Sequence, residues 1–212
     1  MKFKKLEISG FKSFSDKTTF LIENGLTGIV GPNGCGKSNI VESLRWCMGE
    51  NSAKSMRGSG MEDVIFAGTS NRPSKNISEV ALLLDNKNKE GPPQYNDFDE
   101  VGIKRKIEKD KGSKYFINDK EVRARDVQTF FADLSTGAHS PSLISQGKIG
   151  QLVTSKPIER RAILEEAAGI SGIHARRQEA ETRLNAAENN LKRADELKKQ
   201  QQKQLDNLKK QA

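Results

Sequence analysis

Apolar residues alternate or cluster in several short segments of the first part of the chain, and these segments predict β-strands. They cover residues 17–22, 26–30, 62–67, 77–85, 101–108 and 114–118, and residues 1–25 as a whole favour β-structure. β-branched and aromatic residues are frequent in them. Polar, glycine-containing stretches at residues 49–61, 86–100 and 109–113 predict loops and a hairpin turn between the strands.

Helical periodicity is present at three places. Residues 39–48 carry apolar side chains at helical spacing, and residues 125–134 also favour a helix. A third helix is predicted from Pro157, where a missing N–H is harmless, with Ser155 as its cap. Strands interleaved with helices in this order predict a mixed α/β domain with an antiparallel component.

The end of the chain follows a seven-residue repeat. With residue 163 as position a, eleven of the fifteen a and d positions up to residue 212 are apolar, and the positions between are mostly charged or amide residues. This pattern predicts a coiled-coil seam, with a bend at Gly169 and Gly172. A single solvent-exposed helix is the alternative, because Lys198 and Gln201 interrupt the seam. The two patterns place a boundary between residues 1–156 and 157–212.

One motif carries a definite chemistry. Residues 31–38 fit the phosphate-binding pattern G-x-x-x-x-G-K-[ST], between a predicted strand at 26–30 and a predicted helix. Glycines let the backbone aim N–H groups at phosphate oxygens, and the helix start adds a positive dipole end. The lysine of this motif contacts the β- and γ-phosphates, and its serine hydroxyl binds Mg²⁺. We therefore expect a nucleoside triphosphate to be bound by Gly31, Pro32, Asn33, Gly34, Cys35, Gly36, Lys37, Ser38 and Asn39.

The chain carries a net charge of +8, with a pI near 9.4, which suits a polyanionic partner such as DNA. The clusters expected to contribute are residues 104–106, 109–114 and 123–125, although a solvated lysine-rich surface would have the same composition. Two cysteines form neither a disulfide framework nor a metal site. With no membrane-spanning run and no signal-peptide core, the sequence predicts an intracellular protein.

Hydrolysis on a phosphate-loop fold also requires an apolar strand ending in Asp-Glu, and no such run is present. Residues 82–85 come nearest, but Asn86 follows, and the alternation around them favours an ordinary half-buried strand. A Leu-Ser-Gly-Gly segment is absent too. A dinucleotide site is disfavoured, because Asn39 stands where its third glycine belongs. The chain alone is therefore expected to bind nucleotide and to hydrolyse almost none.

Residues 1–172 resemble the N-terminal half of the ATPase head of an SMC (structural maintenance of chromosomes) protein of the bacterial condensin type. The matching segments are residues 6–14, 31–39, 52–58, 61–68, 145–149 and 156–170. The resemblance implies an ABC-type P-loop NTPase lobe with a mixed sheet over residues 1–156, then a head-exit helix and coiled-coil arm over 157–212. It also implies that this is an N-terminal piece, and that a C-terminal head half carries the missing acidic strand.

The same resemblance assigns roles to single residues. Lys37, Gln146 and Arg57 match catalytic positions, and Ser38 and Gln146 match ligands of Mg²⁺. Lys12, Glu62 and Asp63 stand where the family places residues beside the nucleotide. The implied cofactors are ATP and Mg²⁺.

The implied function is chromosome condensation and segregation in the cytoplasm, in association with the nucleoid. Expected partners are the C-terminal head half, a second copy through a hinge and ATP-sandwiched heads, ScpA-like kleisin and ScpB-like subunits, and double-stranded DNA. A DNA-repair ATPase of the Rad50 or RecN kind is the first alternative. A nonenzymatic coiled-coil adaptor that uses nucleotide only as a structural ligand is the second.

Overall fold

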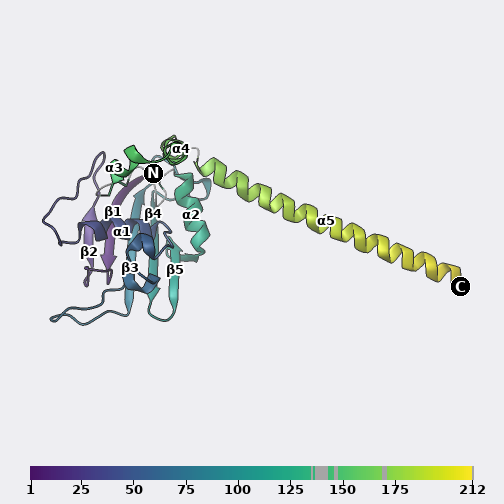
Figure 1. Ribbon diagram of the computed structural model, residues 1–212, viewed down its shortest axis with the longest axis horizontal. Coiled ribbons are helices and arrows are strands. Elements are labelled where there is room, and N and C mark those ends of the chain that lie inside the picture. The colour runs from purple at the N-terminus through teal and green to yellow at the C-terminus, as the bar shows by residue number, and fades with distance from the viewer. Residues whose placement is uncertain (135, 137–142, 146–147, 169–170, 212) are drawn as a thin grey trace. The chain divides into compact units, whose positions relative to one another are not determined.

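The computed structural model describes residues 1–134, 136, 143–145, 148–168 and 171–211 (Figure 1). The chain divides into two compact units, Met1–Gly172 and Ile173–Ala212. The first unit contains a sheet with its helices, and the second contains most of one long helix.

The first unit is built on a six-stranded antiparallel sheet with the strand order β2-β1-β3-β4-β5-β6, of which β2 to β5 are labelled in Figure 1. Its longest pairing joins β3 and β4, from Ile77 opposite Glu108 to Asp85 opposite Glu100. Each of these two strands alternates buried and half-buried positions along its length, so one sheet face is covered. The strands are β1 (Lys2–Ser9), β2 (Thr18–Leu21), β3 (Ile77–Asp85), β4 (Glu100–Glu108), β5 (Gly112–Ile117) and β6 (Lys120–Val122).

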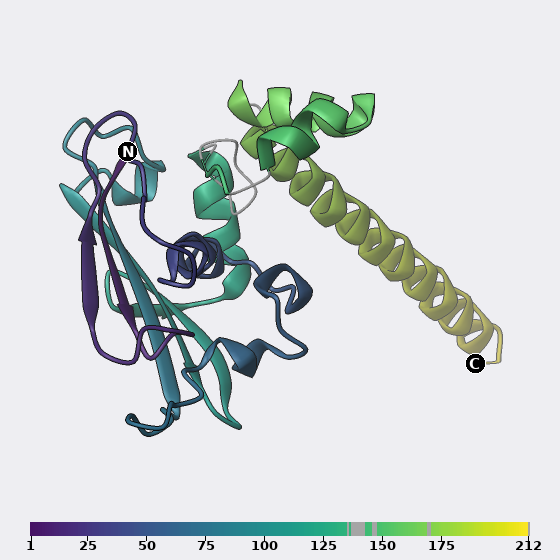
Figure 2. The same cartoon turned by 60° about the vertical axis from the view of Figure 1, so that its left-hand side comes forward.

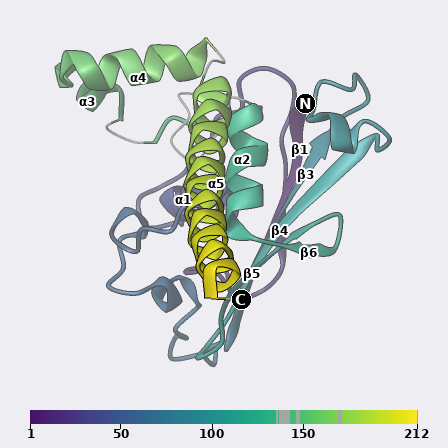
Figure 3. The same cartoon turned by 90° about the vertical axis from the view of Figure 1, so that its right-hand side faces the viewer.

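Helices α1 and α2 cover the same face of this sheet (Figure 2; Figure 3). α1 packs on β3 and β4, and α2 packs on β5. The helices of this unit are α1 (Lys37–Cys47), α2 (Ala124–Asp133), α3 (Lys148–Thr154) and α4 (Pro157–Ala167), with short 3-10 turns η1 (Lys54–Met56), η2 (Met61–Val64) and η3 (Pro93–Tyr95).

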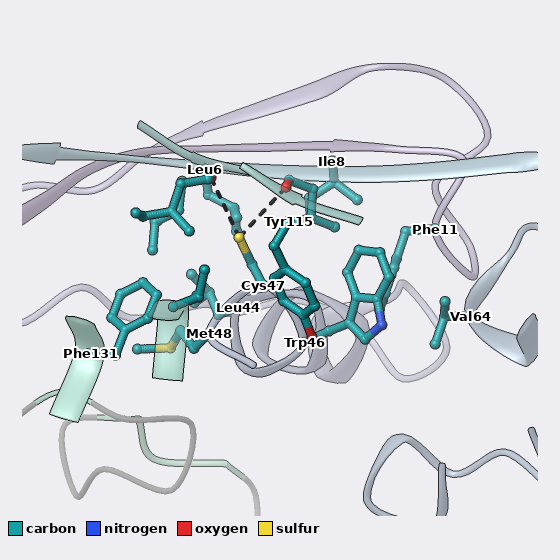
Figure 4. Packing of buried hydrophobic residues seen from close by; sticks show 14 of the residues in the cluster. Leu6, Ile8, Phe11, Leu44, Trp46, Cys47, Met48, Val64, Tyr115 and Phe131 are labelled. Atoms are coloured by element: carbon teal, nitrogen blue, oxygen red, sulfur yellow. Dashed lines mark hydrogen bonds between the residues drawn. The ribbon is translucent and has the colours of Figure 1, made fainter. Parts of the chain in front are cut away.

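The core lies between α1 and the sheet, and Cys47 stands at its centre (Figure 4). The Cys47 thiol lies 3.6 Å from the carbonyl oxygens of both Val80 on β3 and Ile103 on β4. Burial raises the pKa of this thiol to about 12. The C-terminal half of α1 is thus fixed against the two central strands, and this contact positions the loop at the other end of the helix.

Most of the predicted strands and the helices at 39–48 and 125–134 are confirmed, but two predicted strands are wrong. Residues 26–30 form no strand, and Leu26 and Val30 are 97% and 95% exposed. An isolated segment gains nothing from extension unless a neighbouring strand accepts its hydrogen bonds, and no described strand pairs with it.

The second wrong strand is at residues 62–67. Here the Asp63 carboxylate accepts hydrogen bonds from the backbone N–H groups of Ser59 and Gly60, and this side chain closes the 3-10 turn η2. Only Ile65 then makes an isolated bridge, to Phe11. Local side-chain capping has prevailed over the apolar pattern of this segment.

The predicted helix from Pro157 is confirmed as α4, and the long helix α5 (Ser171–Gln211) is 41 residues long. Helix α4 ends at Ala167, so the helical path is interrupted before α5 begins; Gly169, one of the two predicted bend residues, is outside the described residues. Leu184 and Leu191, two positions of the predicted seam, are exposed on α5. The coiled-coil pairing itself stays a prediction. None of the described helices combines the length and the apolar character that crossing a membrane requires.

Candidate nucleotide-binding site

The phosphate-binding motif forms an open loop that ends in the first turn of α1. Gly34 and Gly36 have φ values of +83° and +91°, which are in the left-handed region that favours glycine. Gly36 is the N-cap of α1, and its carbonyl accepts from the N–H groups of Asn39 and Ile40 at 2.9 and 3.2 Å. No side chain caps this helix end. Its first N–H groups and the dipole therefore suit an anion.

The side chain of Lys37 folds over this loop. Its ammonium donates to the carbonyl oxygens of Gly31 at 2.6 Å and Pro32 at 2.5 Å. The Cys35 thiol lies 3.9 Å from the same nitrogen. A Cβ at Gly31 would come within 2.9 Å of the Cys35 sulfur, so a larger residue there would displace the Cys35 side chain. The loop thus holds its only lysine against its own backbone, at the start of α1.

A cavity of about 460 Å³ opens beside the loop and brings several predicted residues together. Lys37, Ser38 and Arg57 line it, and so does Ser145, whose hydroxyl lies 3.4 Å from the Arg45 guanidinium. Gln146, predicted to bind Mg²⁺, lies outside the described residues. The remaining lining residues are Ile29, Val41, Glu42, Arg45, Ser55 and Ile144.

Glu42, a residue that the sequence interpretation missed, lines the cavity and pairs with two predicted residues: Arg57, which also lines the cavity, and Lys12, which does not. The Glu42 carboxylate is buried on α1 and binds the ammonium of Lys12 and the Nε of Arg57, the latter at 2.6 Å. Arg57 also donates to the Asn39 side chain at 3.0 Å. The available signal was an acidic residue four positions after Ser38, which is one turn along the same helix face.

Glu62 and Asp63 are not brought to this cavity. The Glu62 carboxylate accepts the backbone N–H of Asp110 at 3.0 Å, at the turn between β4 and β5. The Asp63 carboxylate caps its own turn, and the N–H of Gly60, followed by the Ser59 hydroxyl, lowers its pKa. Both acids are engaged in local structure, and neither lines the space beside Lys37.

The residues present suit Mg²⁺ held jointly with phosphate. Ser38 lines the cavity together with Lys37 and carries a hydroxyl. Among the described residues, no group of three or more His, Cys, Asp or Glu side chains could hold a metal ion by itself. Mg²⁺ is commonly bound by one or two protein oxygens together with substrate phosphates and water, so a single hydroxyl at this position fits.

The basic clusters predicted for DNA require one correction. Arg105 is only 2% exposed and cannot contact DNA, because its guanidinium lies between the rings of Trp46 and Tyr115, 4.5 and 4.6 Å from their centroids. It donates to the carbonyl oxygens of Trp46 at 2.8 Å and Glu50 at 2.7 Å. Arg105 therefore fastens the C-terminal end of α1 to β4. The alternating strand places residue 105 on the covered face and its two lysine neighbours on the other.

Several lysines of these clusters have acidic partners at the surface. Lys104 pairs with Asp119 at 3.0 Å, and Lys114 pairs with Glu121 at 3.1 Å. Lys111 pairs with Glu108 at 2.6 Å. Exposed pairs of this kind are weak and screened by salt, so these lysines can exchange a carboxylate for a phosphate.

Comparison with known proteins places this geometry in a family. The model of the RecF/RecN/SMC N terminal domain matches residues 2–148. The chain is 57% identical over 212 residues to the chromosome partition protein Smc of Rhodopseudomonas palustris, covering 100% of this chain and 18% of that protein. It is 58% identical over 197 residues to the Smc of Cereibacter sphaeroides, covering 93% of this chain and 17% of that protein.

Solved structures give the same result. The Smc head domain with coiled coil and joint from Pyrococcus yayanosii superposes with a TM-score of 0.68 at 37% identity, covering 99% of this chain and 40% of that one. The Smc head with an extended coiled coil from Pyrococcus furiosus, solved bound to the C-terminal domain of ScpA, gives 0.72 at 34% identity, covering 92% and 49%. The chain spans less than a fifth of the length of these two curated relatives. It belongs to the RecF/RecN/SMC N terminal domain family, and its fold is that of an SMC head.

Proposed function

We propose that this chain binds ATP with Mg²⁺ as the N-terminal part of the ATPase head of a chromosome-segregating SMC protein. The observation that carries the proposal is the uncapped start of α1, preceded by a loop with two left-handed glycines and followed at once by Lys37 and Ser38. This arrangement combines backbone donors, a helix dipole, a mobile cation and a hydroxyl at one place. The 57–58% identity to two chromosome partition proteins supports the biological assignment.

Each residue has a distinct task in this proposal. The first N–H groups of α1 hold the phosphates, and Lys37 exchanges its two carbonyl contacts for β- and γ-phosphate oxygens. Ser38, with Gln146, would hold Mg²⁺, which when bound neutralises phosphate charge. Arg57 lines the same cavity and supplies a guanidinium for the charge that develops during transfer.

Hydrolysis by this site would require a second head segment. β3 alternates buried and half-buried residues up to Asp85, so it does not supply the apolar strand with adjacent acids that activates water. The exposed Leu26 and Val30 support a partner at the same place, because a neighbouring strand would cover them. We therefore expect the C-terminal head half to complete the sheet and the active site together.

The relatives support a proposal for the wider assembly. The Pyrococcus furiosus head was solved bound to the C-terminal domain of ScpA, and another relative is described by its ATP-driven dimerization and DNA-stimulated activation. We propose that this chain likewise assembles with a kleisin of the ScpA type, a ScpB-like subunit and a second head, and that it binds double-stranded DNA. We place this assembly in the cytoplasm, at the nucleoid. The DNA-repair alternative shares the RecF/RecN/SMC family model, but the relatives and solved structures described above are all SMC proteins, which favours the SMC proposal.

Nucleotide titration of the 212-residue chain tests the proposal. The wild type should bind ATP in the presence of Mg²⁺, and Lys37→Ala should weaken binding at least ~100-fold, or about 2.7 kcal/mol, because the loop loses its cation. Lys17→Ala removes an exposed, ion-paired lysine of the same chain and should leave the affinity unchanged. Equal affinities of the wild type and Lys37→Ala would contradict the proposal.

A further inference from the structure

A single buried carboxylate joins two loops beside the candidate site. The Glu42 side chain is 9% exposed, and it binds Lys12, from the loop after β1, and Arg57, from the loop after η1. Both cations have positive φ, at +46° and +54°, a conformation that residues with side chains rarely adopt. Two unusual backbone conformations thus direct two cations to one anion.

Lys12 fixes the backbone next to Arg57 as well as the carboxylate. The Lys12 side chain is 14% exposed. Its ammonium donates to the Glu42 carboxylate and to the carbonyl oxygen of Met56, the residue before Arg57. Its own backbone N–H donates to Val64 at 2.7 Å. Lys12 therefore connects α1, η1 and η2, and these contacts give it a structural role.

Arg57, by contrast, is anchored along one edge only. Its Nε binds Glu42 at 2.6 Å and its Nη2 binds Asn39 at 3.0 Å. The side chain is otherwise 58% exposed and lines the cavity that contains Lys37 and Ser38. Its second terminal nitrogen has no described protein acceptor and can donate to a phosphate oxygen.

We propose that Glu42 and Lys12 form a clamp that positions Arg57 toward the phosphates of the nucleotide. This inference rests on the proposed function and deepens it. An exposed arginine samples many rotamers, and a fixed planar guanidinium loses less freedom when it binds. Glu42 acts through Arg57 and is a positioning residue.

Removing the Glu42 charge has two possible effects on ATP affinity, and they differ in sign. A carboxylate near a polyphosphate repels it, so simple electrostatics predicts tighter binding for Glu42→Gln. Loss of the clamp predicts weaker binding, because Arg57 is released. The sign of the change therefore separates the clamp from a carboxylate that merely lies nearby.

A double-mutant cycle on Mg²⁺-ATP binding by the 212-residue chain gives the test. We expect Arg57→Ala to weaken ATP binding ~10-fold and Glu42→Gln ~5-fold, and the double variant to match Arg57→Ala alone, because coupled residues are non-additive. Glu108→Gln, which removes another ion-paired glutamate, should bind like the wild type. Circular dichroism verifies the fold of each variant.

A second readout needs no nucleotide. In the ¹⁵N-edited spectrum of the free chain, the Nε–H of Arg57 should give a slowly exchanging signal, and Glu42→Gln should abolish it. If Glu42→Gln does not fold, Lys12→Met combined with Glu42→Gln leaves no unpaired buried ammonium and should also abolish the signal.

The clamp is contradicted if Glu42→Gln keeps the Arg57 signal, if it leaves or raises ATP affinity, or if the double variant shows the product of both losses. A wild-type chain that does not bind ATP would instead contradict the proposed function.

Discussion

Replacing Arg105 by Met should strongly destabilise the first unit of the chain, because this buried cation joins α1 to β4. Two hydrogen bonds from the charged group, at 2.8 and 2.7 Å, contribute roughly 1.5–3 kcal/mol each. Stacking between two rings adds roughly 0.5–2 kcal/mol. Burial opposes the charge and lowers the pKa of Arg105, so part of this gain is lost. Met fills much of the volume but removes the charged donor from both carbonyl oxygens, of which that of Trp46 keeps the Gly49 N–H, and we expect a loss of about 3–5 kcal/mol.

Urea unfolding measures this loss, followed by the fluorescence of Trp46, the single tryptophan of the chain. Lys106→Met is the matched control, since residue 106 follows on the same strand but faces the other side of the sheet. The control should stay within about 0.5 kcal/mol of the wild type. A loss below about 1 kcal/mol for Arg105→Met, at an unchanged urea dependence, would refute the view that this guanidinium holds α1 in place.

Three further predictions concern the thiols, DNA and the long helix. The exposed Cys35 should react quickly with a thiol reagent at pH 8, and ATP should protect it. Cys47, whose pKa is raised to about 12 by burial, should react only on unfolding. Because the Cys47 thiol ionises more easily in the unfolded chain, the free energy of unfolding should fall as pH rises from about 9. Fast labelling of both cysteines in the folded chain would contradict this. DNA binding should be independent of sequence and fall steeply with salt in a filter-binding series, because exposed lysines release counterions; an affinity that barely changes with salt would exclude a phosphate-directed surface. An isolated peptide of residues 178–212 should be partly helical by circular dichroism and gain helix from a returning partner strand, and Leu184→Asp with Leu191→Asp should abolish the gain. Full helicity without a partner, unchanged by these substitutions, would reject the seam.

The sequence predicted the sheet well where local pattern and tertiary packing agree. On β3 and β4 every second residue is buried, and the aliphatic residues Val80, Leu82 and Leu84 of β3 belong to that buried set. The phosphate loop was predictable because its glycines, lysine and helix start are contiguous along the chain. Such features need no knowledge of distant residues.

The errors occurred where distant residues decide the outcome. Residues 26–30 are apolar enough for a strand, but a strand requires a neighbour, and the sequence pattern does not say which segment supplies it. Arg105 stands among lysines in the sequence, yet it is buried because Trp46 and Tyr115 bracket it. Glu42 has partners 30 residues before it and 15 after it, so its role emerged only when the loops were seen together.

ATP hydrolysis with and without the C-terminal head segment tests the central claim most directly. Phosphate release should be almost undetectable for the 212-residue chain, should appear when the matching C-terminal head segment is added, and should disappear again with Lys37→Ala. Robust hydrolysis by this chain alone, surviving Lys37→Ala, would contradict the account.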